Sequence, residues 1–162
     1  MRIRRALPTE LAAVGDLTVA AYAPFVDGPE DPYTHHLRDA ARRDREAELW
    51  VATDEDGRLL GTVTTCPVGS PWREIAADDE GEFRMLAVAP DAQGQGVGDA
   101  LVAHSVAVSR RRRHRAVVLS SLRTMAAAHR VYQRQGFRRT PERDWAPLPG
   151  VDLITFARDL EE

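Results

Sequence analysis

A glycine-rich turn in the middle of the chain, Gln93-Gly94-Gln95-Gly96-Val97-Gly98, is the feature that most limits how this sequence can fold. It follows an apolar stretch typical of a strand and precedes a long stretch with helical spacing. Three glycines in five positions let the backbone adopt strained angles and approach a ligand closely. Consecutive N–H groups and the dipole of the following helix would then form an anion site, best suited to a phosphate or pyrophosphate. Taken alone, the pattern fits a tight structural turn equally well.

Two common phosphate-binding patterns do not match this turn. A nucleotide-hydrolysing loop ends in Gly-Lys-Ser/Thr, whereas all 22 Lys and Arg residues of this chain are arginine. A dinucleotide-binding fold opens with Gly-x-Gly-x-x-Gly and carries an acidic residue about 20 residues further on. Here the spacing is Gly-x-Gly-x-Gly, in mid-chain and after strands that look antiparallel. Neither of these two folds is indicated.

Length and composition predict one globular domain over residues 1–162. The net charge of -3 gives no overall basic field for nucleic acid. The only cysteine, Cys66, cannot form an intramolecular disulfide, which suits a reducing compartment. No apolar run approaches the roughly 18 residues of a membrane span, and no apolar segment follows the basic start. We therefore predict a cytoplasmic protein that binds neither nucleic acid nor membrane.

Hydrophobic spacing predicts an α/β fold with a mixed sheet. Strands are expected over residues 2–6, 49–52, 59–64, 82–88, 116–120, 137–140 and 151–157. Helices are expected between Thr9 and the loop 24–32, over 33–45, from the glycine-rich turn to about 113, and over 124–135. The order is therefore β-α-α-β-β-β-α-β-α-β-β.

The segment 84–101, which contains the turn, resembles motif A of the GCN5-related N-acetyltransferases, the GNAT family. The core of that motif, (Arg/Gln)-x-x-Gly-x-(Gly/Ala), is met by Gln93, Gly96 and Gly98, after Leu-Ala-Val-x-Pro and before a long helix. The segment 128–137 resembles motif B, Ala-x-x-Leu-Tyr-x-x-x-Gly-Phe. The resemblance implies the GNAT fold, a mostly antiparallel mixed sheet of about seven strands flanked by about four helices. Its fourth and fifth strands would splay apart to admit a cofactor.

The same resemblance implies an N-acetyltransferase that moves an acyl group, expected to be acetyl, from CoA to a primary amine. The acceptor, on a small molecule or peptide, would attack directly in a ternary complex, and a homodimer is expected by analogy. The turn would hold the CoA pyrophosphate, and the N–H of Val88 would polarise the thioester carbonyl. The implied cofactor-binding residues are Leu86, Ala87, Val88, Gln93, Gly94, Gln95, Gly96, Val97, Gly98 and Asp99. The alternative is a non-catalytic acyl-CoA-binding or regulatory module on the same fold.

Tyr132 matches the tyrosine of motif B and is the predicted general acid. CoA leaves as a thiolate, which a phenol within hydrogen-bond reach can protonate. The alternative role is a core aromatic, because Met125, Ala128 and Val131 share its helical spacing. Many family members carry Asn where this chain has Met125, so Thr124 or Ser121 would have to supply that hydrogen bond to the cofactor arm.

Glu82 is the predicted general base, because an ammonium acceptor must lose a proton before it can attack. Strand alternation predicts that its side chain shares one face with those of Arg84, Leu86 and Val88. The alternatives are a solvated carboxylate at the strand start or an ion pair with Arg84. In this fold the acceptor enters beside the first two helices, and the predicted contacts are Tyr22, Tyr33, His36 and Arg84.

Other charged and polar groups favour simpler roles. The acidic run 78–80 could attract a cationic amine, although an exposed loop explains it as well. The arginine run 110–113 fits a solvated helix end, where cations are favoured, better than a nucleic-acid site. The five histidines have no ligand spacing, so no metal is expected. Cys66 is interpreted as a small core residue rather than a nucleophile.

Overall fold

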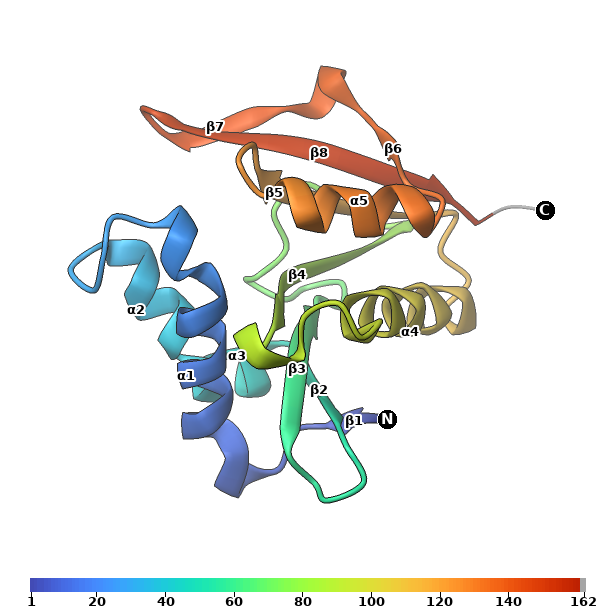
Figure 1. Ribbon diagram of the computed structural model, residues 1–162. Coiled ribbons are helices and arrows are strands. Elements are labelled where there is room, and N and C mark those ends of the chain that lie inside the picture. The colour runs from blue at the N-terminus through green and yellow to red at the C-terminus, as the bar shows by residue number, and fades with distance from the viewer. Residues whose placement is uncertain (161–162) are drawn as a thin grey trace.

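A computed structural model describes residues 1–160 and shows a twisted sheet between two layers of helices (Figure 1). The strand order is β1-β2-β3-β4-β5-β8-β6, and β7 also pairs with β8. All the pairings are antiparallel except that of β4 with β5. The strands are β1 Arg2–Arg5, β2 Glu48–Thr53, β3 Leu59–Thr65, β4 Glu80–Val88, β5 Ala116–Leu122, β6 Arg138–Arg139, β7 Trp145–Leu148 and β8 Val151–Asp159.

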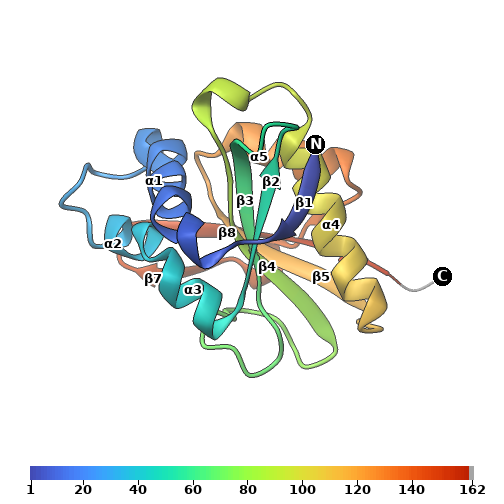
Figure 2. The same cartoon turned by 90° about the horizontal axis from the view of Figure 1, so that it is seen from below.

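The helices cover opposite faces of the sheet, as the view from below shows (Figure 2). On one side lie α1 Leu11–Tyr22, α2 Pro32–Arg38 and α3 Ala40–Glu46, and on the other lie α4 Val97–Arg111 and α5 Ala126–Arg134. Each layer of helices covers a separate cluster of buried hydrophobic residues. Under α4 and α5 the cluster includes Phe83, Leu86, Leu101 and Phe156. Under α1 and α2 it includes Tyr22, Leu37, Cys66, Met85 and Ala87.

Residues 1–160 contain eight strands and five α-helices, one more of each than predicted. The helix expected over 33–45 is two helices, because Asp39 leaves the helical conformation at ψ 64°. Its side chain then accepts the N–H of Arg42 and caps α3. The additional strand, β7, contains Pro147, a residue that is uncommon within strands because it has no N–H to donate. It forms nevertheless because β8 offers it a partner across the turn at Pro149 and Gly150.

The predicted separation of the fourth and fifth strands is confirmed. β4 and β5 pair only where Glu80–Glu82 face Ala116–Val118. Beyond that point β4 stays paired with β3, while β5 stays paired with β8. Within the described chain, the second half of β4 therefore has no strand partner on its β5 side, and the two strands diverge (Figure 1).

A β-bulge interrupts β4 at Met85, whose φ is +53°. Arg84 pairs with Thr64 and Ala87 with Thr62, so β4 has one residue more than β3 in this interval. An extra residue reverses the faces of the side chains that follow it. The prediction that Glu82, Arg84, Leu86 and Val88 share one face is therefore wrong. Arg84 lies over Trp72 on the α1–α2 side, whereas Leu86 and Val88 pack in the cluster under α4.

Candidate active site

The glycine-rich turn presents bare backbone at the start of α4. Gly94 and Gly96 both have φ +80°, a left-handed conformation that favours glycine. Gly96 is the N-cap residue of α4 and has no side chain to accept the N–H groups of the first turn. A Cβ added at Gly94 or Gly96 would meet nothing within 4 Å. The turn thus leaves room for a ligand beside the N-terminus of a 15-residue helix, an arrangement suited to an anion.

The next two predicted cofactor residues join this turn to α5. Gly98 has an ordinary helical conformation, and a Cβ there would lie 3.6 Å from the Val131 side chain, so packing does not require glycine. The carboxylate of Asp99 accepts hydrogen bonds from Arg134 at 2.9 Å and from Gln135 at 3.3 Å. The hydrogen bond from Arg134 is the main reason that the pKa of Asp99 is lowered. Arg134 therefore offsets the negative charge of Asp99 beside the anion site.

The last residues of β4 offer backbone groups to the gap beside β5. The N–H of Ala89 donates to the Leu60 carbonyl of β3 at 2.8 Å. Because successive N–H groups of a strand point to opposite sides, the N–H of Val88 points away from β3 and into the gap. The residues present thus fit CoA in two ways, with free helix-terminal amides for a pyrophosphate and an unpaired strand edge for an amide-bearing arm.

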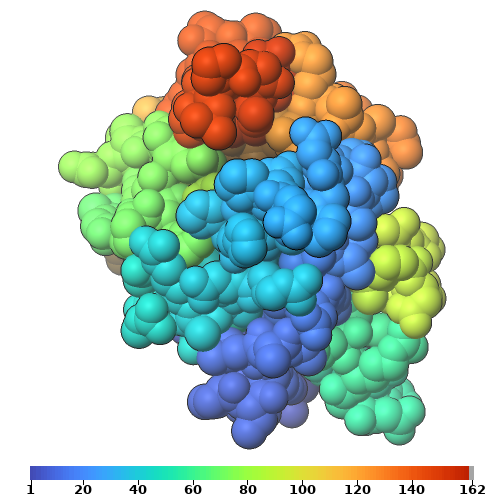
Figure 3. Space-filling view, turned by 90° about the vertical axis from the view of Figure 1, so that its left-hand side faces the viewer, coloured from blue at the N-terminus to red at the C-terminus, as the bar shows by residue number. Residues whose placement is uncertain are grey.

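A cavity of about 760 Å³ opens between the two halves of the sheet. Its walls come from the α1–α2 segment, the loop 67–79, the middle of β4, the end of β5 and the β7–β8 hairpin. The α1–α2 segment, that loop and the hairpin meet on the face shown in Figure 3. The structure brings most of the predicted catalytic and acceptor residues together there, since Tyr22, Tyr33, His36, Arg84 and Tyr132 line the cavity. Leu86 reaches it as well, and so do Ser121 and Thr124.

Tyr132 is buried at the inner end of this cavity. Its ring packs against Phe83, Phe137 and Phe156, with centroid separations of 5.4 to 6.2 Å. Burial raises the pKa of its phenol, and the hydroxyl of Ser121 acts in the opposite direction. Tyr132 is thus both a core aromatic and a cavity group, so the two alternative roles are compatible.

Arg84 and Glu74 form a polar pair in the cavity wall. Arg84 Nε lies 3.0 Å from Glu74 Oε1, and both side chains are more than four-fifths buried. The guanidinium also lies over the Trp72 ring, 5.4 Å from its centroid. Burial raises the pKa of Glu74, and the charge of Arg84 only partly opposes that change. Sequence reasoning missed Glu74, because its loop shows no periodicity and follows no motif.

Glu82 does not line the cavity. Its Oε1 accepts the backbone N–H groups of Glu74, Ile75 and Ala76 at 3.0 to 3.2 Å. Its Oε2 is buried and has no hydrogen-bond partner within residues 1–160. Burial is the largest effect on its pKa and raises it, against those three N–H groups. The carboxylate of Glu82 thus holds the loop that carries Glu74 to the cavity.

The acidic run 78–80 also lies outside the cavity. Asp79 binds Arg115 at 2.7 Å, and Glu80 binds Arg143 at 2.9 Å. These ion pairs tie the start of β4 to β5 and to the turn before β7. Asp79 and Glu80 are thus paired with arginines away from the cavity, and the attraction of a cationic acceptor by this run stays a prediction. The arginine run is partly used in the same way, since Arg112 binds Glu48 at 2.9 Å.

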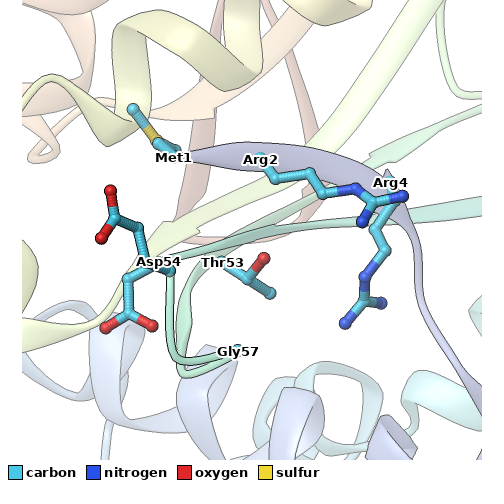
Figure 4. A pocket seen from close by; sticks show the side chains of 7 residues that line it. Met1, Arg2, Arg4, Thr53, Asp54 and Gly57 are labelled. Carbon is cyan, nitrogen blue, oxygen red and sulfur yellow. The ribbon is translucent and has the colours of Figure 1, made fainter.

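A second hollow of about 350 Å³ lies at the sheet edge, between β1 and the β2–β3 turn. Figure 4 shows Arg2 and Arg4 on one side of it and Asp54 on the other. It contains none of the predicted site residues. Within residues 1–160, no cluster of three or more His, Cys, Asp or Glu could hold a metal ion, and no helix is long and apolar enough to cross a membrane.

Comparison with known proteins agrees with the fold and with the geometry of the site. The sequence model of the acetyltransferase (GNAT) family matches residues 13–137. A mycothiol acetyltransferase from Cellulomonas flavigena is 36% identical over 147 residues, covering 75% of this chain but only 41% of that protein. N-acetyltransferase 8B from Homo sapiens is 32% identical over 115 residues, covering 69% and 49%. The chain thus spans less than half the length of these two relatives.

Solved structures agree over almost the whole chain. A GCN5-related N-acetyltransferase from Kribbella flavida has a TM-score of 0.72 at 25% identity, covering 98% of this chain and 97% of that one. The protein yncA from Salmonella typhimurium, solved with its cofactor acetyl-CoA, has a TM-score of 0.70 at 21% identity and covers 100% and 95%. The second likeness concerns the fold alone. With the family match over residues 13–137, the predicted family is confirmed: the chain belongs to the acetyltransferase (GNAT) family.

Proposed function

We propose that the protein transfers an acetyl group from acetyl-CoA to the primary amine of a small molecule or peptide, and that one domain carries both binding sites. The observation that carries this proposal is the divergence of β4 and β5 directly beside the uncapped start of α4. The gap and the helix terminus together suit a phosphate-bearing thioester. The cavity lined by Leu86 of β4, the end of β5 and Tyr132 suits an acceptor.

In this proposal, different residues of the chain bind the cofactor, assist the chemical step and contact the acceptor. The amides from about Gln95 to Asp99 bind the pyrophosphate, and the N–H of Val88 polarises the thioester carbonyl. The amine attacks the carbonyl carbon, the C–S bond breaks, and the Tyr132 phenol protonates the leaving thiolate. The second proton that the nitrogen loses on becoming an amide restores the phenol, directly or through water. Tyr33, His36 and Arg84 contact the acceptor. The products are the acetylated amine, CoA thiol and the proton that the ammonium lost.

The proton that the ammonium loses requires a base. A base must come within hydrogen-bond reach of the amine, directly or through one water. Glu74 meets this condition best because it lines the cavity. Glu82, the base expected from the sequence, acts in this proposal through the loop it holds, and a water-mediated role for Glu82 is the competing assignment.

A thiol-release assay tests the function. Purified protein with acetyl-CoA is presented with amino acids including aspartate, polyamines, aminoglycosides, short peptides and the unacetylated precursor of mycothiol. The names of the relatives support placing small molecules first in this panel. Release of thiol that requires an amine, with the acetylated product seen by mass spectrometry, is the expected result. CoA binding without turnover on any acceptor would favour the non-catalytic module.

A further inference from the structure

We infer that the acceptor is an amino acid, whose ammonium group binds at Glu74 and whose neighbouring carboxylate binds at Arg84. The inference rests on the proposed function and deepens it, because it names the class of amine. Small zwitterions are thereby favoured over polyamines, aminoglycosides and the N-termini of peptides, which carry no carboxylate beside the amine.

An ion pair in the cavity wall offers a ligand one group of each sign. Arg84 Nε lies 3.0 Å from Glu74 Oε1, and both residues line the cavity. Arg84 Nη1 donates to the backbone carbonyl of Trp72 at 3.2 Å, and the guanidinium lies over the ring of the same residue. These contacts hold the cation and the anion side by side on one wall.

Each member of this pair keeps an atom for a ligand. Within residues 1–160, Nη2 of Arg84 is paired with no carboxylate and no backbone carbonyl, and Oε2 of Glu74 accepts no hydrogen bond. Neither atom is among the side-chain atoms that are fully buried without a partner, so both remain accessible. A guanidinium binds a carboxylate, and a carboxylate binds an ammonium. A ligand that carries both groups on neighbouring carbon atoms therefore suits the pair.

A second buried arginine adds positive charge behind this wall. Arg43, on α3, is 0% exposed, and its Nε and Nη2 have no hydrogen-bond partner within residues 1–160. Its Nη1 donates at 2.6 Å to the backbone carbonyl of His36, a residue that lines the cavity. Burial lowers its pKa to about 10, so the group stays charged at neutral pH. Two buried arginines thus accompany one buried carboxylate, Glu74, and the excess of positive charge favours an acceptor with a carboxylate over a purely cationic amine.

The other charged groups of the cavity are already bonded or exposed. Glu46 binds Arg42 at 2.8 Å, and Asp31 caps α2 by accepting the N–H of Tyr33. Three more charged residues are exposed, where water and salt screen them: Asp27, Arg123 and Asp152. The buried groups therefore have the stronger effect on the charge that is favoured beside the amine.

Matched pairs of acceptors test the inference on the full chain. Each common amino acid is compared with its own carboxamide, and kcat/KM is measured by thiol release from acetyl-CoA. Loss of the carboxylate also lowers the pKa of the amine, so the supply of free amine by itself favours the carboxamide. The expected result is that the amino acids that react exceed their carboxamides by about tenfold or more, since a hydrogen-bonded charge pair is lost in the carboxamide.

Arginine variants locate the carboxylate site. In Arg84→Gln the preference for the amino acid over its carboxamide should disappear, whereas Arg84→Lys keeps a positive charge and should retain part of it. Arg123→Gln is the matched control, because Arg123 also lines the cavity but is exposed, and it should show the wild-type preference. Acetyl-CoA affinity and thermal unfolding, measured in parallel, should match the wild type in at least Arg84→Lys.

Several outcomes would overturn the inference and leave the proposed function standing. They are equal or faster turnover of the carboxamides by the wild type, a preference that survives in Arg84→Gln, or its loss in Arg123→Gln alone. Acetylation of polyamines or peptides with no amino acid acetylated has the same meaning. Wild-type protein that releases no thiol with any amine would instead remove the proposed function, and the inference with it.

Discussion

The proposed cofactor site and the proposed acceptor cavity differ in which atoms they offer a ligand. Residues 93–99 and the end of β4 offer backbone N–H groups, and their glycines keep side chains out of the way. The acceptor side offers side chains, among them Tyr33, His36 and Arg84, held on separate elements by buried contacts. Adding atoms to the glycines of the cofactor site should therefore weaken CoA binding. Removing functional groups from the acceptor cavity should instead impair the reaction with the amine.

The largest effect is expected at Tyr132, where the two sides meet. Tyr132→Phe removes the acid but keeps the buried ring, so kcat should fall by a factor of roughly 10²–10⁴ while CoA affinity is retained. Steady-state kinetics and calorimetric titration with CoA measure the two quantities. Tyr33→Phe is the matched control on the acceptor side and should change the acceptor KM instead. Unchanged turnover of Tyr132→Phe at every pH would remove Tyr132 from the mechanism.

The second prediction compares two carboxylates of the acceptor side. Glu74→Gln should lower kcat/KM for the amine by roughly 10² or more, because a base is lost. A base acts when deprotonated, so wild-type activity should fall as pH drops through the pKa of Glu74, which burial raises. This acid limb of the pH profile should vanish in Glu74→Gln.

Glu82→Gln provides the contrast, because the amide oxygen of glutamine can still accept the N–H groups of residues 74–76. Its pH profile should keep the acid limb, with a small loss of activity. If Glu82→Gln abolished the limb and Glu74→Gln did not, the base would be Glu82.

The third prediction concerns added atoms on the cofactor side. Gly96→Ala should weaken CoA binding by about tenfold, or about 1.4 kcal/mol, because the new methyl group points into the space before the first amides of α4. Gly57→Ala is the matched control, since Gly57 has φ +82° and equally open surroundings in the β2–β3 turn. Both variants should lose roughly 1–2 kcal/mol of stability from left-handed strain. Equal CoA affinity in both would contradict an anion site at the turn.

The smallest effect on the reaction is expected from a substitution at Gly15, which lies in α1. A Cβ there would overlap the backbone carbonyl of Arg38 at the end of α2. Gly15→Ala should therefore separate α1 from α2, cost roughly 1–3 kcal/mol of stability and raise the acceptor KM a few-fold. Chemical denaturation and kinetics measure these changes. An accompanying loss of CoA affinity would show that the two sides are not independent.

The sequence by itself determined the features that depend on consecutive residues. Glycine spacing within 93–98 predicted a turn with strained backbone angles before a long helix, because the conformation of a turn and the start of a helix are local properties. The spacing around Tyr132 predicted a helix that carries it, and the resemblance of the two motifs to the GNAT family implied the divergence of β4 and β5. Those three predictions needed only motif spacing and periodicity.

Only the tertiary structure decided which side chains meet across the cavity. One extra residue at Met85 reverses the faces on which the Leu86 and Val88 side chains lie. No local sequence pattern predicts this bulge, because it arises in the pairing of β4 with β3. Glu74 reaches the cavity because Glu82, on the strand that follows its loop, accepts its N–H. Ser121 and His129 meet because β5 and α5 pack together. Contacts of this kind depend on packing between elements, which periodicity within an element does not encode.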